Sequence, residues 1–306
     1  MKMFLGLSIC ILLCFGFLGF AEGQGEASSD SPGVVPDGRY SEAPMLRALV
    51  AQGELPPVDE RLPDIPYVAP TIVEIGSYGG TIHTFGLGAG AWNDLNESPE
   101  NHMTNLLRID SNTFAITGKM ARDYNLADDG KSATLYLRPG TKWSDGAPFT
   151  ADDILFKFED MHWHDDVETW NYYGSGHGTA QAGVSRINKV DDYTVEFEMD
   201  VPFYSIELLW AQWQGGEWGM FQPKHYLKKW HITYNENADM LAAEEGFEGW
   251  AEALKHHFFW NPTTDIDKPT LVPWMFTDQT DSVKAWVRNP YFYSVDEAGQ
   301  QLPYID

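Results

Sequence analysis

The chain has 306 residues and a formal net charge of −25, with 45 acidic side chains against 20 lysines and arginines. A surface of this sign repels phosphate backbones and anionic lipid headgroups, which argues against nucleic-acid binding and against peripheral membrane attachment. The length allows one large domain or two modest ones.

The first 21 residues are typical of a secretory signal peptide. Lys2 precedes an apolar run, residues 3–20, that only glycines and Ser8 interrupt, and the small residues Gly19 and Ala21 favour cleavage after Ala21. We therefore expect residues 1–21 to be removed and the protein to be exported to the periplasm or cell envelope. A retained membrane anchor is the alternative, although the run is short for a spanning helix.

Both cysteines, Cys10 and Cys14, lie inside this leader. The exported chain would then have no disulfide, thiolate metal site or cysteine nucleophile. A lipid anchor on one of them is a second alternative. The preceding residues, Ile9 and Leu13, are large where lipid attachment normally requires a small residue, so soluble export is favoured.

Residues 22–70 are expected to form a linker and a short N-terminal extension, ahead of a domain that spans residues 71–306. The stretch 22–35 is rich in Gly, Ser and Asp, which is typical of a flexible linker. Residues 41–50 predict a short amphipathic helix, and the prolines of residues 55–63 exclude a helix there.

Residues 128–138 predict a turn followed by a half-buried strand. Asp129-Gly130 has turn chemistry, because glycine accepts a positive φ and aspartate tolerates it. Ala133, Leu135 and Leu137 then alternate with polar or amphipathic residues, which is the period of a strand with one face on a core.

Residues 139–161 predict two reversals and then a capped helix. Pro139-Gly140 ends the strand, and the run Ser144-Asp145-Gly146 makes a second turn. Thr150 and Asp153 have the spacing of a capping box, in which each side chain accepts from a backbone N–H of the first helical turn. The helix places apolar residues on one face: Ile154, Leu155, Phe158 and Met161.

Two further strands are expected to join the one at residues 133–138 in a sheet beside a groove. Residues 194–199 alternate apolar Val195, Phe197 and Met199 with polar neighbours, and residues 81–85 form the other candidate. A helix is expected to open at Pro223.

Motifs that could hold a nucleotide or a metal are weak. The glycines of residues 86–90 fit a loose dinucleotide fingerprint, but an acidic polar loop follows where a phosphate and a helix would have to lie. His162 with His164, and His256 with His257, are metal candidates that lack a third ligand at a recognisable spacing. We predict no metal site and no cofactor.

Aromatic and amide side chains favour a binding protein. Flat rings stack on sugars or pack against peptide side chains, while Asn and Tyr offer hydrogen bonds. We assign Trp143, Trp210 and Trp286 to the core.

Six ordered motifs resemble the bacterial extracellular solute-binding proteins of family 5, in a branch with long chains. The resemblance covers about residues 41 to 306, and its most specific part is the run 128–153. The other motifs are residues 78–82 (Tyr-Gly-Gly-Thr-Ile), 191–195, 223–227, 288–293 and 301–306. It implies an α/β fold of the type II periplasmic-binding-protein kind: a mixed sheet flanked by helices, forming the first lobe of a two-lobed clamp. Members of this branch are about twice as long, so we expect an N-terminal portion without the second lobe.

The resemblance also implies a function. The protein would be the substrate-binding component of an ABC importer, capturing a short peptide or an oligosaccharide and delivering it to a membrane permease. We expect a monomer that catalyses nothing. Family members bring backbone and aromatic side chains to the ligand in the segments that correspond to residues 92–93 and 170–173. The resemblance therefore implies these ligand-binding residues: Trp92, Asn93, Trp170, Asn171, Tyr172 and Tyr173. The alternative is a secreted glycoside hydrolase or another carbohydrate-active enzyme, which needs two carboxylates at a set separation across a sugar ring.

Overall fold

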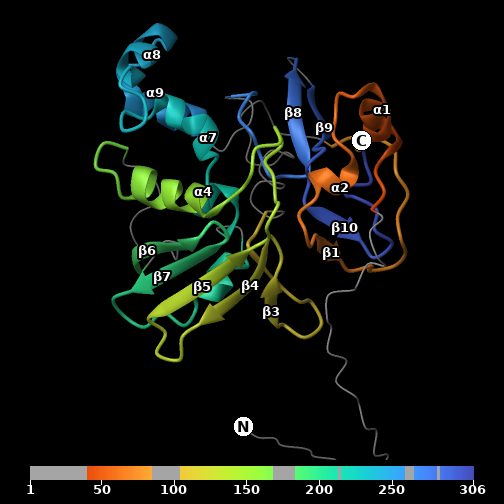
Figure 1. The fold of residues 1–306 in the computed structure, drawn as a ribbon, viewed down its shortest axis with the longest axis horizontal. Coiled ribbons are helices and arrows are strands. Elements are labelled where there is room, and N and C mark those ends of the chain that lie inside the picture. The colour runs from red at the N-terminus through yellow and green to blue at the C-terminus, as the bar shows by residue number, and fades with distance from the viewer. Residues whose placement is uncertain (1–39, 85–103, 168–182, 213–214, 259–264, 281–282) are drawn as a thin grey trace, which may run out of the picture. The chain divides into compact units, whose positions relative to one another are not determined.

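A four-stranded antiparallel sheet is the largest sheet in the part of the chain that the structure, a computed structural model, describes: residues 40–84, 104–167, 183–212, 215–258, 265–280 and 283–306. Its strands are β4 (Ala121–Leu126), β5 (Ser132–Leu137), β7 (Thr194–Met199) and β6 (Val184–Asp191), in the order β4-β5-β7-β6 (Figure 1). All described residues belong to one compact unit, Pro32–Asp306.

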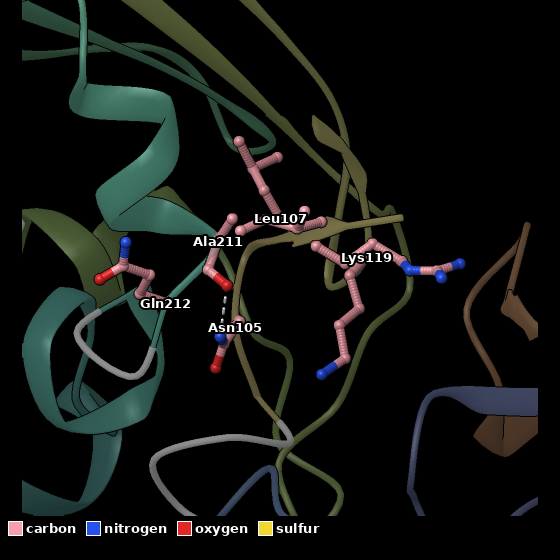
Figure 2. A pocket seen from close by; sticks show the side chains of 7 residues that line it. Asn105, Leu107, Lys119, Ala211 and Gln212 are labelled. Atoms are coloured by element: carbon pink, nitrogen blue, oxygen red, sulfur yellow. Dashed lines mark hydrogen bonds between the residues drawn. The ribbon is translucent and has the colours of Figure 1, made fainter. Parts of the chain in front are cut away.

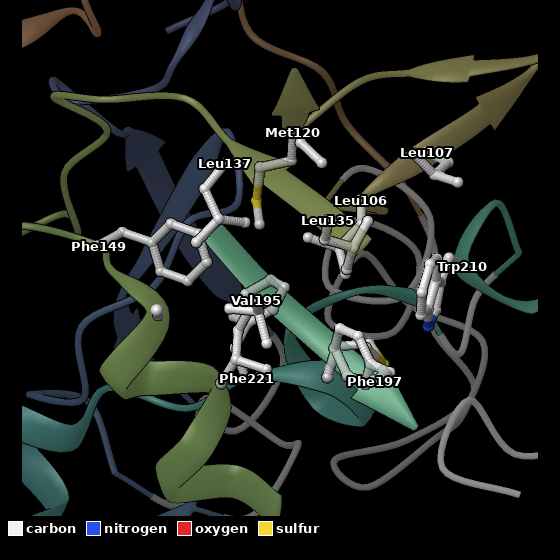
Figure 3. Packing of buried hydrophobic residues seen from close by; sticks show 14 of the residues in the cluster. Leu106, Leu107, Met120, Leu135, Leu137, Phe149, Val195, Phe197, Trp210 and Phe221 are labelled. Atoms are coloured by element: carbon white, nitrogen blue, oxygen red, sulfur yellow. The ribbon is translucent and has the colours of Figure 1, made fainter. Parts of the chain in front are cut away.

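The two middle strands bury one face each. Every second side chain of β5 and of β7 is buried, as the alternation of apolar residues in the sequence predicts. Leu135 pairs with Val195 and Ala133 with Phe197, so the buried faces of the two strands coincide. Figure 3 shows these side chains meeting aromatic rings from the segments that cover the sheet. Four of the rings of this first core are labelled there: Phe149, Phe197, Trp210 and Phe221.

One helical segment is shared by two hydrophobic cores. It consists of α4 (Ala151–Leu155) and a wider π-helical stretch, η1 (Phe156–His162). Thr150 and Asp153 form the predicted capping box at its start. Ile154 and Phe158 pack into the first core, whereas Phe156 and Met161 pack into the second.

The second core is helical. It lies among α7 (Lys224–Leu227), η4 (Lys228–Trp230), α8 (Ala238–Glu245) and α9 (Trp250–Phe258). The predicted helix after Pro223 is therefore present as α7, and Pro223 occupies its N-cap position. Gly246 ends α8 in the left-handed conformation, with φ +91°, which lets the chain turn back into α9.

The N-terminal extension packs against the C-terminal end of the described chain. It contains α1 (Pro44–Gln52), α2 (Val58–Arg61) and β1 (Tyr67–Ala69), and β1 pairs in parallel with β10 (Ser294–Asp296). The prediction that prolines exclude a helix from residues 55–63 was therefore wrong for α2, because the prolines flank this single turn and Pro57 stands at its N-cap. Parallel pairing here and antiparallel pairing in the central sheet, with helices around both, confirm the predicted mixed α/β class.

A buried arginine fixes this contact. Arg61 has no exposed surface and forms an ion pair with Glu42, which is 8% exposed. Its guanidinium also donates to the Gln301 side chain at 2.8 Å and to the Pro56 carbonyl at 3.0 Å. Because Arg61 and Gln301 are 240 residues apart, this network ties the two ends of the unit together.

Two hairpins and two short helices complete the described elements. The hairpin β2 (Leu107–Ile109) and β3 (Ile116–Gly118) precedes the central sheet, and α5 (Ile206–Trp210) and α6 (Glu217–Met220) follow it. The second hairpin pairs β8 (Trp274–Gln279) with β9 (Lys284–Arg288).

The assignment of Trp286 to the core was wrong. Trp143 and Trp210 are fully buried, as expected, but Trp286 lies on β9 and remains half-buried. A two-stranded hairpin has only its partner strand to cover a side chain, and here Phe276 stacks edge-on at 5.6 Å.

The prediction of a strand at residues 81–85 was also wrong for residues 81–84, which the structure describes. Residues 81–84 are exposed and form no strand, and Phe85 lies outside the described residues. Hydrogen bonds to the C-terminal segment stop just before them, since Gly79 donates to Tyr304 at 2.9 Å and Gly80 accepts from Asp306 at 3.2 Å. A strand needs a continuing partner, and the described chain supplies none for residues 81–84.

The predicted signal peptide, residues 1–21, and the glycines 86–90 lie outside the described residues. Within the described ranges, no helix is long and apolar enough to cross a bilayer.

Candidate functional site

A hollow of about 420 Å³ opens beside the β2–β3 hairpin (Figure 2). Its walls come from the stretch leading into β2, from β2 itself, from the residue after β3, and from the chain just beyond α5. The lining residues are Asn105, Leu107, Arg108, Ile109, Lys119, Ala211 and Gln212.

Local sequence explains the shape of the hairpin. The Asp110 carboxylate accepts from the backbone N–H groups of Asn112 and Thr113, at 3.0 and 2.8 Å, which forms the turn between β2 and β3. Gly118 ends β3 where a Cβ would collide with the carbonyl of Arg122. The chain can therefore fold back closely at this point and bring Lys119 to the hollow.

Backbone hydrogen bonds hold the two sides of the hollow together. Leu106 donates to the carbonyl of Gly215 at 2.9 Å, and Lys119 donates to the carbonyl of Leu106 at 3.0 Å. Segments far apart in the sequence thus form one rigid wall.

The amide of Asn105 has a fixed orientation. Its Nδ2 donates to the carbonyl of Ala211 at 3.0 Å, and a carbonyl can only accept, so the amide cannot be reversed without losing this bond. The residue is 6% exposed, and its Oδ1 has no hydrogen-bond partner among the described residues. A buried acceptor left unsatisfied costs about 1–3 kcal/mol, so Oδ1 provides a strong site for a donor.

Two cationic side chains line the same hollow. Burial, assisted by the positive charge of Arg108, lowers the pKa of Lys119 to about 8. Lys119 is still mostly protonated at neutral pH, since that value lies about one unit above it. Arg108 faces the Asp110 carboxylate at 3.5 Å. None of the seven lining residues is acidic.

Figure 2 shows how these side chains lie. Asn105 and Lys119 extend to one side of β2, while Leu107 points to the other side and is fully buried in the first core. Gln212, at the end of the opposite wall, is exposed. A group that enters the hollow would therefore meet a fixed amide acceptor and an ammonium together.

The six predicted ligand-binding residues lie outside the described residues, in the segments 85–103 and 168–182. Trp92 and Asn93 belong to the segment whose last residue immediately precedes Thr104, one position before Asn105. Their contact with a ligand stays a prediction, as does that of residues 170–173.

The histidines considered as metal ligands contact aromatic rings and carboxylates of the protein. Burial, together with the charge of Lys157, lowers the pKa of His162 to about 4, and its ring lies against Phe158 and Trp163. His257 uses both ring nitrogens, at 2.6 Å from Asp265 and 2.8 Å from Glu245. No group of three or more metal-binding side chains occurs within the part of the chain that the structure describes.

Sequence reasoning missed the hollow. Asn105, Arg108 and Lys119 carry no motif, and about a hundred residues separate them from Ala211 and Gln212. One signal was available: Arg108 and Lys119 are cations in a strongly acidic chain, on either side of a predictable Asp-Ser-Asn-Thr turn.

Comparison with known proteins places this fold among the periplasmic binding proteins. The structure superposes on an oligopeptide-binding protein OppA with a TM-score of 0.72 and 32% identity, over 88% of this chain and 41% of that one. It superposes on the periplasmic binding protein MelB of Agrobacterium fabrum C58, solved in complex with stachyose, with a TM-score of 0.66 and 26% identity over 88% of this chain and 40% of MelB.

Residues 115–306 match the middle region of the bacterial extracellular solute-binding proteins, family 5, and the chain belongs to this family. This confirms the predicted resemblance. Among curated relatives, the periplasmic alpha-galactoside-binding protein of Rhizobium meliloti (strain 1021) is 29% identical over 84% of this chain and 37% of its own length. The chain thus spans about two-fifths of the length of these proteins.

Proposed function

We propose that this chain is part of the substrate-binding component of an ABC importer, which captures a short peptide or an oligosaccharide and delivers it to a membrane permease. One observation carries the proposal: the chain superposes over 88% of its length on both an oligopeptide-binding protein and a stachyose-bound one. Binding is reversible, and no bond of the ligand is made or broken.

The hollow beside β2 supports a binding role over a hydrolytic one. A glycosidase places two carboxylates across the scissile bond, whereas none of the seven lining residues carries a carboxylate. A fixed amide, two cations and an exposed glutamine orient a polar ligand through hydrogen bonds. A micromolar dissociation constant requires about 8 kcal/mol, which aromatic burial and a few such bonds supply without a catalytic group.

The predicted aromatic residues complete the proposed ligand surface. Trp92, Asn93 and residues 170–173 stack on or hydrogen-bond to the ligand in this proposal. The protein acts as an exported monomer in the periplasm, after cleavage of residues 1–21, and docks on the permease when loaded. Support comes from the relatives, whose names describe periplasmic binding proteins.

Isothermal titration of the purified chain tests the proposal with two panels, one of di- to pentapeptides and one of stachyose and smaller α-galactosides. We expect a micromolar dissociation constant for at least one ligand, which mass spectrometry then recovers intact. Absence of binding in both panels, or conversion of the ligand, would overturn the proposal.

A matched pair of variants tests the aromatic surface. Replacing Tyr172 and Tyr173 by alanine should weaken binding by about tenfold or more, because each lost ring removes about 1 kcal/mol of contact. Tyr204→Ala is the control, since Tyr204 is an exposed tyrosine beside the Gly130 turn. Equal binding by all three proteins would refute the role of residues 172 and 173.

A further inference from the structure

The loop that follows η4 is organised around one buried histidine. His231 has no exposed surface, and its carbonyl accepts the backbone N–H groups of Tyr234 and Asn235, each at 2.9 Å. Its ring also reaches η1, where Nε2 lies 3.0 Å from the carbonyl of Asp160. Tyr234 supports the same point, since its hydroxyl donates to the Asp160 carboxylate at 2.6 Å. The loop, residues 231–235, is thus fastened to the helical segment that both cores share.

We propose that His231 is an acid-sensitive latch. A proton taken up at its Nδ1 releases the loop 231–235 from η1 and loosens the second core, whose helices α8 and α9 follow this loop. The latch concerns the fold alone, so it stands or falls independently of the ligand and of the proposed function.

Hydrogen bonds fix the protonation state of this ring. A carbonyl only accepts, so His231 Nε2 carries a hydrogen that it donates to Asp160. A backbone N–H only donates, so the bond from the Thr233 N–H to Nδ1, at 3.2 Å, requires a free lone pair on Nδ1. The native contacts therefore fit the neutral Nε2–H tautomer and exclude the imidazolium, which has a hydrogen on both nitrogens.

A neighbouring histidine has the same local geometry. His164 Nδ1 accepts the N–H of Asp166 at 3.3 Å, again from two residues further along the chain, as an aspartate does in an Asx turn. Its ring meets His231 edge-on with centroids 5.2 Å apart, and both rings lie against Trp250, at 5.2 and 4.7 Å. Two imidazolium rings at this separation would repel each other, so the pair strengthens the preference of His231 for the neutral form.

The groups that face His231 agree with this hydrogen-bond argument. Burial lowers the pKa of His231 below its usual value of about 6.5. The Asp160 carbonyl and carboxylate oppose this shift, whereas His164 and Lys224 add to it. The other side chains packed on the ring are aromatic and uncharged at neutral pH: Phe156, Tyr234 and Trp250.

Acid opens this latch, and alkali leaves it closed. Because the native pKa lies below the unfolded value of about 6.5, the contacts of His231 are at full strength above pH 6.5 and are lost progressively as pH falls towards the native value. At pH 5, an open state in which the ring titrates near 6.5 gains at most about thirtyfold in population over pH 8. His257, in the same core, titrates in the opposite sense, since burial is outweighed by its bonds to Asp265 and Glu245 and its pKa is raised. The two histidines must therefore be separated by experiment.

Amide hydrogen exchange of the full chain at pH 5 and pH 8, corrected for intrinsic exchange rates, tests the latch by comparing wild type with His231→Asn. Asparagine still offers an acceptor to the Thr233 N–H in an Asx turn, but it takes up no proton. We expect the opening of residues 226–247 in wild type, relative to His231→Asn, to rise by about fivefold to thirtyfold from pH 8 to pH 5. The ratio of the two proteins cancels the other titrations, that of His257 included.

His256→Asn is the matched control, because His256 belongs to α9 of the same core and packs against Phe247 at 5.0 Å. The ratio of wild type to this variant should not change with pH. A ratio that is also constant for His231→Asn overturns the latch. If His231→Asn does not fold, nitrogen NMR shifts of the histidine rings in wild type decide. A bare Nδ1 at pH 7 that takes up its proton together with loss of protection at the Thr233 amide supports the latch, and a doubly protonated His231 in the folded protein overturns it.

Discussion

The rings of Trp230 and His257 stack face to face, with centroids 3.6 Å apart and planes inclined by 22°. Both rings donate to the same carboxylate of Glu245, the indole N–H at 3.0 Å and His257 Nε2 at 2.8 Å, and His257 Nδ1 lies 2.6 Å from Asp265. An imidazolium between two carboxylates and over an indole face is stabilised by charge and by a cation–π contact. This contact joins η4 to α9 across the second core.

His257 should therefore make stability depend on pH. Burial opposes the charge on its ring, but the bonds to Asp265 and Glu245 more than offset burial, so the pKa of His257 is raised above 6.5. The stabilisation is fully present below the unfolded-state pKa of about 6.5 and is lost as pH rises through the higher native value. Urea unfolding at pH 6, 7 and 8 should show this decline, and His257→Phe should flatten it.

His256→Asn is the control for this experiment. His256 lies next to His257 on α9 but packs against Phe247, with centroids 5.0 Å apart. A pH profile that His257→Phe leaves unchanged would contradict the assignment.

Removing the partner of a buried charge should be costly. Glu42→Ala leaves Arg61, which has no exposed surface, without its carboxylate. We expect a loss of about 3 kcal/mol in the free energy of unfolding, measured by denaturant titration, because an uncompensated charge remains buried. Glu198→Ala breaks the more exposed pair with Arg186, along with a hydrogen bond from Asn188, and should cost about 1 kcal/mol. Similar losses of unfolding free energy in Glu42→Ala and Glu198→Ala would contradict this prediction.

The inward face of β7 should be far more sensitive than its outward face. Phe197 is fully buried against Trp210 and Phe158, with centroids 5.0 and 5.7 Å away. Phe197→Ala should lower the free energy of unfolding by about 3–5 kcal/mol, since the cavity cannot close. Glu196→Ala, one residue earlier on the other face, should change it by less than about 0.5 kcal/mol. Differential scanning calorimetry should show the larger loss of stability for Phe197→Ala. A larger loss for Glu196→Ala would contradict the prediction.

Local chemistry made much of the central sheet predictable. The alternation of Ala133, Leu135 and Leu137 defined the buried face of β5, and the spacing of Thr150 and Asp153 defined the start of α4. Both signals act within a few residues, so tertiary packing was not needed to interpret them. The π-helical stretch that follows depends on packing against two cores at once, which periodicity cannot reveal.

Prediction failed where a residue's environment depends on distant partners. Trp286 has the composition of a core residue, but its hairpin leaves it half-buried. The hollow needs Asn105 beside Ala211, a contact over 106 residues that no local pattern encodes. Aromatic chemistry and the resemblance to the family suggested the ligand-binding residues, and they remain predictions.

The π-helical stretch at residues 156–162 sets which side chains of this helix face the first hydrophobic core and which face the second. A regular helix advances about 100° per residue, so deleting Glu159 would swing Met161 and the chain beyond it through that angle. Met161 would then turn away from the second core, whereas Phe156 and Phe158, which precede the deletion, would keep their places in the two cores. Melting of one core should therefore propagate to the other through the helix that they share.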